Sequence, residues 1–220
     1  MSLQRVLWLG GAAFFMALGA LRIGSPQLSG DPDPALSDSA LAVRFLDGVR
    51  GATPLACDVV IRSLGIGYGW RHIQVEPDGS ADGSEVLRWA QRRSHDPQVI
   101  PVLRRHMEDS DVCVRRVAAR LLGRTRQPQA VSVLTAALGS PNPTTRQLAA
   151  IGLGYAEERS TVDPLLSRLS DEVPAVRAAA AWALGEVEDV RAVAPLSRLL
   201  RNDSDPAVRR AAAMALGTMY

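Results

Sequence analysis

From about residue 96 onwards, the hydrophobic positions of the chain alternate between two helical patterns. In the first pattern, large apolar side chains stand four residues apart, as in Val99, Leu103 and Met107, so that they form one stripe along a helix. In the second pattern, a run of small apolar residues follows a proline, as it does after Pro174, and leads to Gly185. Proline suits the first turn of a helix, and a glycine in the left-handed conformation commonly ends one. We therefore expect pairs of helices, the second of which stops at its glycine.

The two patterns recur together at a nearly constant interval, which marks a repeat. The pair Leu-Gly and an arginine that precedes it keep the same register in four successive units. The leucines of the first helix are evenly spaced throughout, so the single extra residue of the last unit lies in the turn at positions 201–205. Such units bury their apolar faces by stacking on one another, which predicts an all-α solenoid. The recurring residues are Leu103, Leu134, Leu165 and Leu196 in the first helix, Arg115, Arg146, Arg177 and Arg209 in the second, and the pairs at 122–123, 153–154, 184–185 and 216–217.

The repeat unit resembles a known family, the short HEAT-like repeats of the type named after phycobilisome lyases. The resemblance rests on Pro-x-Val-Arg followed by Ala-Leu-Gly, at residues 174–177 with 183–185 and at 206–209 with 215–217, and it covers residues 96–220. It implies a right-handed α-solenoid of helical hairpins, a fold that serves mostly as a binding scaffold. Because lyases of this family attach or detach bilins on cysteine, the resemblance also raises a bilin lyase-like enzyme as an alternative. No residue of this chain carries over as catalytic.

A degenerate unit and an insertion precede the clear repeats. Pro54 and Leu64 have the spacing of the proline and leucine of a second helix, with Cys57 in the arginine register, and residues 40–49 supply a first helix. The next unit follows much later than the repeat interval requires, so the chain carries an insertion between the two. This insertion contains a glycine-rich stretch and a short helix expected at residues 84–93. We therefore expect residues 39–95 to form a capping repeat with an insertion, and residues 96–220 to form four repeats.

The N-terminal residues 6–21 form an uncharged, strongly apolar segment between Arg5 and Arg22. At a rise of about 1.5 Å per residue, a helix of this length spans roughly 24 Å, and snorkelling by Arg22 extends it towards the ~30 Å of a bilayer core. We predict an uncleaved transmembrane anchor at residues 1–23; a cleaved signal peptide, with a cleavage site near residues 17–19, is the alternative. The anchoring side chains are Val6, Leu7, Trp8, Leu9, Phe14, Phe15, Met16, Leu18 and Leu21.

Residues 24–38 are rich in proline, glycine, serine and aspartate, which indicates a linker between the anchor and the body. Arginine before the apolar segment and acids after it favour a cytoplasmic N-terminus. We therefore predict a single-pass protein of the bacterial inner membrane whose body lies in the periplasm.

Charge and the scatter of reactive side chains argue against several classes of function. All 25 basic residues are arginines and they face 23 acidic ones, so the net charge of +2 does not favour a nucleic-acid-binding protein. The three histidines and two cysteines form no cluster at metal-ligand spacing. They assemble no nucleophile with a base, and the glycine-rich stretch lacks the spacing of a phosphate-binding loop. We therefore expect no catalytic, cofactor or metal site, and a protein that is not an enzyme.

The two cysteines, Cys57 and Cys113, occupy nearly equivalent positions in consecutive units. Stacked helices lie about 8–10 Å apart, whereas the Cα atoms of a disulfide are ~4.4–6.8 Å apart. The repeat geometry therefore predicts free, buried thiols, unless the insertion folds the cap back; a disulfide is the alternative if the body is exported.

The recurring arginines of the second helices are expected to have a structural role. The planar guanidinium makes two directed hydrogen bonds at once, which suits donation to acids or carbonyls in neighbouring turns. The candidate acids are Asp111, Asp171, Glu172 and Asp205.

A second set of arginines forms a candidate binding surface. Arg116, Arg120 and Arg124 stand four residues apart and make a basic stripe on one second helix. Either the acids within residues 108–111 neutralise it as a solvated face, or the stripe binds an anionic partner such as an acidic protein surface or lipid headgroups.

The register of Arg120 continues through the later units as a ridge of apolar side chains. Its members are Ile151, Trp182 and Met214. The ridge either packs between repeats or binds a partner, with Trp182 as its anchor because large aromatic side chains dominate protein interfaces. The predicted partner-binding residues are thus those of the stripe and the ridge.

Taken together, these features predict a membrane-anchored HEAT-repeat scaffold that mediates protein–protein interaction. The anchor raises the local concentration of the body near membrane partners, so a weak contact suffices. We expect integral-membrane protein partners and no nucleic acid or metal, as in an accessory subunit of a respiratory or photosynthetic membrane complex. The alternatives are a bilin lyase-like enzyme and a secreted soluble HEAT-repeat adaptor.

Overall fold

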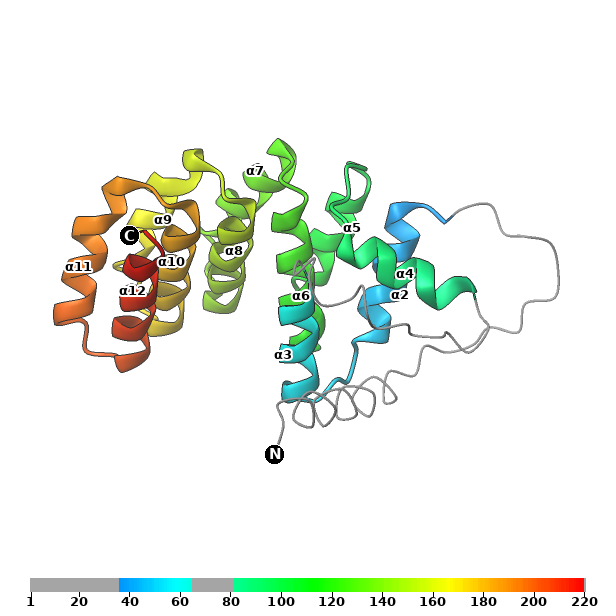
Figure 1. Ribbon diagram of the computed structural model, residues 1–220, viewed down its shortest axis with the longest axis horizontal. Coiled ribbons are helices and arrows are strands. Elements are labelled where there is room, and N and C mark those ends of the chain that lie inside the picture. The colour runs from blue at the N-terminus through cyan, green and yellow to red at the C-terminus, as the bar shows by residue number, and fades with distance from the viewer. Residues whose placement is uncertain (1–35, 65–80, 220) are drawn as a thin grey trace, which may run out of the picture. The chain divides into compact units, whose positions relative to one another are not determined.

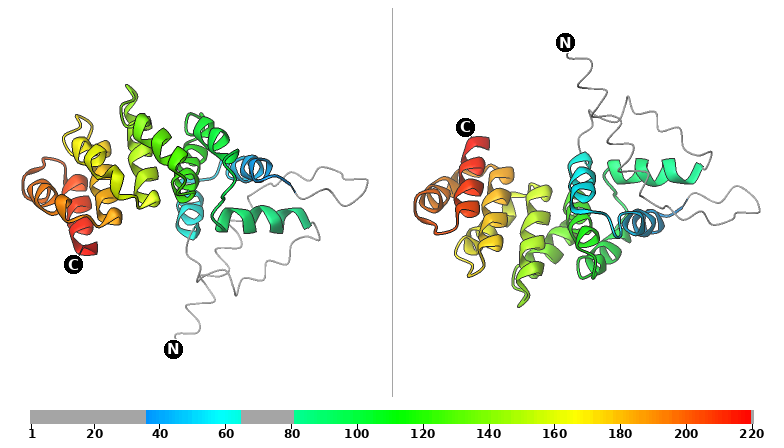
Figure 2. Two further views of the ribbon diagram at one scale, coloured as in Figure 1. Left: turned by 90° about the horizontal axis from the view of Figure 1, so that it is seen from above. Right: turned by 90° about the horizontal axis from the view of Figure 1, so that it is seen from below.

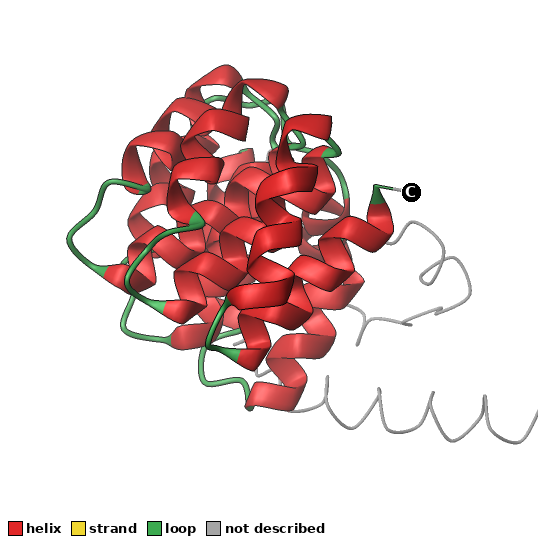
Figure 3. Cartoon of the chain, turned by 90° about the vertical axis from the view of Figure 1, so that its left-hand side faces the viewer, coloured by secondary structure: helices red, strands yellow, loops and turns green. Residues whose placement is uncertain are grey.

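The computed structural model describes residues 36–64 and 81–219, and these two ranges consist of helices and short turns without any strand (Figures 1 and 3). The predicted all-α class is confirmed. The predicted anchor at residues 6–21 and the glycine-rich stretch at 65–80 lie outside the described residues. None of the described helices is long and apolar enough to span a membrane. The described α-helices are α2 (Asp38–Gly48), α3 (Pro54–Ser63), α4 (Ala81–Gln91), α5 (Val99–His106), α6 (Val112–Arg124), α7 (Pro128–Ala137), α8 (Pro143–Ala156), α9 (Val162–Arg168), α10 (Pro174–Val187), α11 (Val193–Asn202) and α12 (Pro206–Thr218).

The chain divides into two compact units. Among the described residues, the first unit contains α2, α3, α4 and the short segment Asp111–Val114. The second unit contains Arg93–Ser110 and the chain from Arg115 onwards, which includes the remaining hairpins.

In the first unit, α2 packs against α4. The ring of Phe45 meets that of Trp89 edge to face, with centroids 6.5 Å apart, and both side chains are buried. Side chains cap two of the helices, because the hydroxyl of Ser37 accepts a hydrogen bond from the amide of Ala40 and that of Thr53 accepts one from Ala56. The short helix expected at residues 84–93 is α4, which begins earlier.

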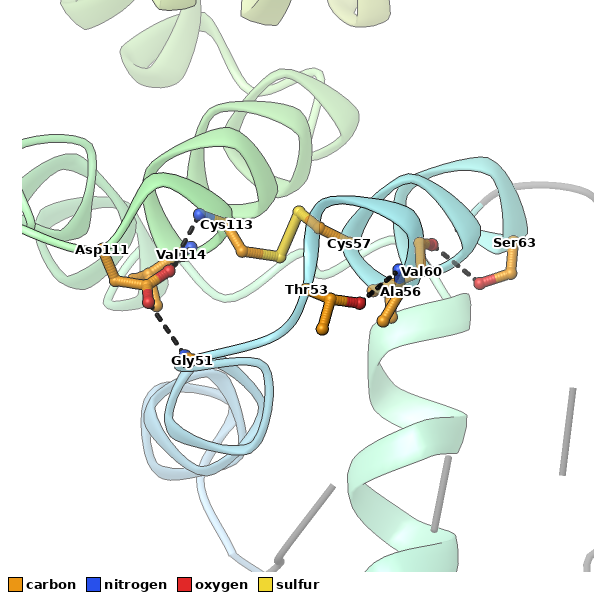
Figure 4. Close-up of a disulfide and its surroundings, with 9 residues drawn as sticks. All are labelled: Gly51, Thr53, Ala56, Cys57, Val60, Ser63, Asp111, Cys113 and Val114. Atoms are coloured by element: carbon orange, nitrogen blue, oxygen red, sulfur yellow. Dashed lines mark hydrogen bonds between the residues drawn. A yellow bond between two sulfur atoms is a disulfide. The ribbon is translucent and has the colours of Figure 1, made fainter. Parts of the chain in front are cut away.

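The first unit also contains a disulfide between Cys57 of α3 and Cys113 in the first turn of α6, with Cα atoms 5.6 Å apart (Figure 4). The predicted free thiols are therefore wrong. That prediction assumed the spacing of regularly stacked helices, but α3 departs from this spacing and brings its cysteine to the beginning of α6. The carboxylate of Asp111 completes this contact, since it accepts hydrogen bonds from the amides of Gly51 at 2.8 Å and Cys113 at 2.8 Å (Figure 4).

The second unit is built from hairpins whose second helices, α8, α10 and α12, pack side by side in successive layers (Figures 1 and 2). A proline occupies the first turn of each of these three helices, as predicted. The repeated leucine of each first helix lies in the core between the two helices of its hairpin. All four of these side chains are at most 1% exposed: Leu103, Leu134, Leu165 and Leu196.

The glycines of the Leu-Gly pairs do not end the second helices, contrary to the prediction. Helices α8 and α10 continue past Gly154 and Gly185 and end where Glu157 and Glu188 adopt left-handed backbone conformations, with φ of 52° and 54°. The glycines are required for close packing instead. A Cβ atom on Gly185 would lie 2.7 Å from the Cα atom of Ala215 in α12, so only glycine lets the two helices approach this closely.

Two of the four recurring arginines clamp neighbouring hairpins together. The guanidinium of Arg146 donates from Nε and Nη2 to the carboxylate of Asp171, at 2.8 and 2.9 Å, and Arg177 binds Asp203 in the same way, at 2.8 and 2.9 Å. The side chains of Arg146 and Asp171 are only 8% and 3% exposed. Of the predicted acids, Asp171 and Glu172 are confirmed as partners, whereas Asp203 takes the place predicted for Asp205.

Acid should weaken these clamps. Hydrogen bonds from Arg146 hold the pKa of Asp171 below its usual value, and those from Arg177 do the same for Asp203. The stabilisation is therefore complete above the unfolded pKa of about 4 and is lost as the pH falls through the lower folded pKa values. We expect D171N to lower the melting temperature by several degrees at neutral pH and to flatten its decline below about pH 4. Thermal unfolding followed by circular dichroism at a series of pH values checks this; a wild-type melting temperature that is level throughout the acid range would contradict it.

Candidate functional site

Three side chains from neighbouring second helices form a continuous row, which we call the aromatic row: Arg120 of α6, Tyr155 of α8 and Trp182 of α10. The guanidinium carbon of Arg120 lies 4.1 Å from the centroid of the Tyr155 ring, and Arg120 Nη1 donates a hydrogen bond to the Tyr155 hydroxyl. The rings of Tyr155 and Trp182 are tilted by 60° with centroids 5.0 Å apart. The row therefore joins a cation–π contact to an aromatic pair.

The backbone of α8 makes room for this row. A Cβ atom on Gly154 would lie 2.6 Å from the Trp182 ring, so the ring rests directly on the glycine backbone. Tyr155 and Trp182 are half-buried, which leaves part of each ring accessible. Trp182 therefore packs between repeats with only part of its surface. The rest of its surface is open to a partner, so both interpretations of the ridge apply to this residue.

The other predicted residues lie on the same helices with different exposures. Arg116 and Arg124 of α6 and Ile151 of α8 are half-buried, whereas Met214 of α12 is 62% exposed. Burial lowers the pKa of Arg124, and the neighbouring charges of Arg120 and Arg93 lower it further. The arginines of the basic stripe therefore lie close enough to one another for their charges to interact.

An acidic pocket lies beyond the aromatic row, where α8 and α10 end. It has a volume of about 370 Å³. Burial raises the pKa of Glu186, and the carboxylates of Glu157 and Glu188 raise it further. The pocket is lined by Glu157, Gly185, Glu186, Val187, Glu188 and Thr218.

The row and the pocket together form a surface whose character changes from basic through aromatic to acidic. Burial raises the pKa of the Tyr155 hydroxyl, with a further contribution from Glu186, and lowers that of Arg120. Tyrosine remains neutral and arginine charged at neutral pH. Such a surface favours a partner segment that is acidic at one end and basic at the other.

The described residues contain no group of three or more His, Cys, Asp or Glu side chains arranged to hold a metal ion. His106 is buried, and its Nδ1 lies 2.8 Å from the carbonyl oxygen of Val102, in keeping with a packing role. The two cysteines are bonded to each other.

Sequence reasoning identified both ends of the aromatic row but missed Tyr155, its central residue. The signal was present in the repeat. Tyr155 and Glu186 occupy the register of Arg124 in the next two units. Comparing this register across the units would have shown an aromatic and an acidic side chain next to the residues of the ridge.

Three solved structures have folds similar to this chain. The complex of CpcE and CpcF of phycocyanin lyase from Nostoc sp. PCC7120 is 19% identical, with a TM-score of 0.47 over 89% of this chain and 70% of that chain. Human deoxyhypusine hydroxylase in complex with glycerol is 18% identical, with a TM-score of 0.43 over 97% and 90% of the two chains. An engineered protein is 20% identical, with a TM-score of 0.42 over 94% and 89%. A comparison with curated proteins found no match.

These structures correct one prediction. We expected a protein that is not an enzyme, but a lyase and a hydroxylase are among the proteins with similar folds. That prediction is withdrawn.

The repeats themselves identify the family. A family model described as HEAT repeats matches residues 84–141 and 132–217. The two matches together cover more than half of the 220 residues, and they include α4 to α12 almost completely. The chain belongs to the HEAT repeat family.

Proposed function

We propose that this protein is a membrane-anchored interaction scaffold that docks a protein partner on the aromatic row. The observation that carries the proposal is the half-buried row of Arg120, Tyr155 and Trp182, held in place by the close approach of α8 and α10. Tryptophan, tyrosine and arginine are the residue types most enriched among the side chains that dominate binding energy at protein interfaces. The partner segment contacts the row with apolar side chains and places acidic groups beside Arg116 and Arg124.

The proposed setting is the outer side of a bacterial inner membrane. The apolar segment at residues 6–21 anchors the chain, residues 24–38 act as a linker, and a right-handed solenoid of four repeats follows a capping repeat. The disulfide between Cys57 and Cys113 supports export of the body, because disulfides persist in oxidising compartments such as the periplasm. In this setting the chain is an accessory subunit of a larger membrane complex, and its partners are integral-membrane subunits.

Purification of the full chain from native membranes in mild detergent tests the proposal. We expect the wild-type chain to elute in a complex with a membrane protein. Because removal of a dominant interface side chain costs at least about 2 kcal/mol, W182A and R120Q should weaken the complex by about 30-fold or more. Partner recovery over a dilution series, measured by mass spectrometry, gives the fold-change.

The matched controls carry similar changes elsewhere on the second unit. V190A removes apolar surface from a side chain that is 79% exposed, and R198Q neutralises an exposed arginine of α11. Both should retain the partner. A wild-type chain that elutes as a monodisperse monomer, or variants of the row that retain the partner as well as the controls do, would show that the row is not a docking surface.

A further inference from the structure

The surface around the aromatic row carries opposite charges at its two ends, and the repeat register arranges these charges in pairs. Arg124 and Glu186 occupy the same register two hairpins apart, in the last turns of α6 and α10. Arg126 and Glu188, just beyond the same helix ends, also share a register. All four side chains are exposed or half-buried. Each end of the surface therefore carries, at matching places on its helix, the charge that complements the other end.

The aromatic row supplies a third complementary pair. Arg120 and Trp182 share a register, on α6 and α10, and both are half-buried. A guanidinium and the face of a tryptophan ring attract each other. Between these two helices lies α8, whose half-buried Ile151 and Tyr155 occupy the intermediate places in the registers. The three pairs are therefore placed symmetrically about α8, with unlike partners on its two sides.

Such a surface is complementary to a second copy of itself. A two-fold axis that runs along α8 in the plane of the surface brings α6 of one copy opposite α10 of the other, and α8 opposite itself. Residues of the same register then meet, and each pair occurs twice. The pairs are Arg120 with Trp182, Arg124 with Glu186, and Arg126 with Glu188.

The side chains at the axis are compatible with their own counterparts. Ile151 and Tyr155 meet as apolar and aromatic groups. Glu157 also faces its counterpart, but it forms an ion pair with Arg126 of its own chain. At the acidic end, burial raises the pKa of Glu186, and repulsion from Glu157 and Glu188 raises it further. A guanidinium from the second copy would relieve that repulsion.

We propose that a second copy of this chain docks on the aromatic row in this two-fold arrangement and covers the row until a membrane partner displaces it. The inference rests on the proposed function, since it takes the row as the docking surface, and it adds the regulation of that surface. Anchoring in one membrane raises the effective concentration of the second copy, so a weak contact suffices. Self-association and partner binding then exclude each other.

Charge reversal at the most exposed pair tests the arrangement. Arg126 and Glu188 are exposed and both have left-handed backbone conformations, with φ of 52° and 54°, so each residue type already fits the other's place. In a dimer of R126E, two attractive contacts become repulsive, and the same holds for E188R. We expect each variant to dimerise at least about tenfold more weakly than the wild-type chain. The full chain, overproduced and purified in mild detergent at low salt, is measured by light scattering over a dilution series.

A mixture of the two variants tests the pairing itself. When a copy of R126E meets a copy of E188R, both contacts join opposite charges again. The mixture should therefore dimerise at least about fivefold more tightly than either variant alone. The matched controls are E108R and R198E, which reverse exposed charges elsewhere on the second unit. Both should dimerise as the wild-type chain does.

A cross-link tests the position of the axis. A residue on a two-fold axis lies beside its own counterpart, so a short bismaleimide should join two copies of I151C. It should not join copies of S132C, which has its cysteine at an exposed position of α7. The native cysteines do not react, because they are bonded to each other.

Three results would overturn the inference. The first is a wild-type chain that stays monomeric throughout the dilution series. The second is equal dimerisation of R126E, E188R and the controls, which assigns the contact to another part of the chain, such as the N-terminal segment. The third is a mixture that dimerises no more tightly than its components, or an I151C chain that cross-links no more than S132C.

Failure of the proposed function is a separate result. A chain that does not dimerise, but still loses its membrane partner with W182A, contradicts only the two-fold arrangement. A chain that dimerises as described, but recovers no membrane partner from native membranes, contradicts only the proposed function.

Discussion

Reduction of the disulfide between Cys57 and Cys113 should lower the free energy of unfolding of the first unit by about 2–5 kcal/mol. The bond closes a loop of 56 residues, and the chain-entropy relation assigns about 4 kcal/mol to a loop of that length. Cys57 is the buried residue of α3, so the bond joins this helix to the unit through its buried side chain. Hydrogen exchange read by mass spectrometry, with and without reductant, measures the effect separately for α2, α3 and α12.

The double variant C57S/C113S is the control for this experiment. It should exchange as fast without reductant as the reduced wild-type chain does, and added reductant should not change it. Exchange in α12, which belongs to the other unit, should be the same in all samples. If reductant leaves exchange in α2 and α3 of the wild-type chain unaltered, the bond does not stabilise the unit.

Replacement of Gly123 by alanine should destabilise the second unit by about 1–3 kcal/mol or more. The new Cβ atom would overlap the backbone carbonyl of Gly152 in α8, and a backbone atom cannot move aside as a flexible side chain can. The cost exceeds the gain of up to about 1 kcal/mol that alanine brings over glycine in a helix. Urea unfolding followed by circular dichroism measures the net change.

The matched control is G217A, in the same register of α12. Nothing lies within 4 Å of a Cβ atom there, so only the helix propensity acts and the variant should be neutral or more stable by up to about 1 kcal/mol. Equal effects of G123A and G217A would show that close packing of the glycine backbone contributes nothing.

The repeat register predicted the parts of the fold that depend on apolar periodicity. The leucines of the first helices are buried as expected. Large apolar side chains spaced four residues apart lie on one face of a helix, and that face packs into the core. The register could not predict where the second helices end. Glycine serves both as a helix stop and as a site of close approach, and only the position of the next helix decides between the two uses.

The cysteine pair and the aromatic row were missed for related reasons. The disulfide forms because the degenerate first unit departs from regular stacking. The repeat spacing of the sequence predicts only the regular distance between helices, so it could not predict this contact. Arg120 and Trp182 were singled out one at a time from a single register. Tyr155, which joins them, stands in the neighbouring register, and the contact depends on the rotation of α8 about its axis.

The arginine clamps also make the coupling between hairpins unequal along the second unit. Arg146 and Arg177 each reach an aspartate in the next turn. Ser140 stands where the partner of Arg115 would be, and the hydrogen bonds that Arg115 makes to described residues go to carbonyls of its own turn. In a linear array, the nearest-neighbour coupling sets how many repeats unfold as one. The clamps therefore couple the three hairpins from α7 to α12 to one another, whereas α6 is coupled to α8 by the backbone contact at Gly123 and by the contact of Arg120 with Tyr155 instead.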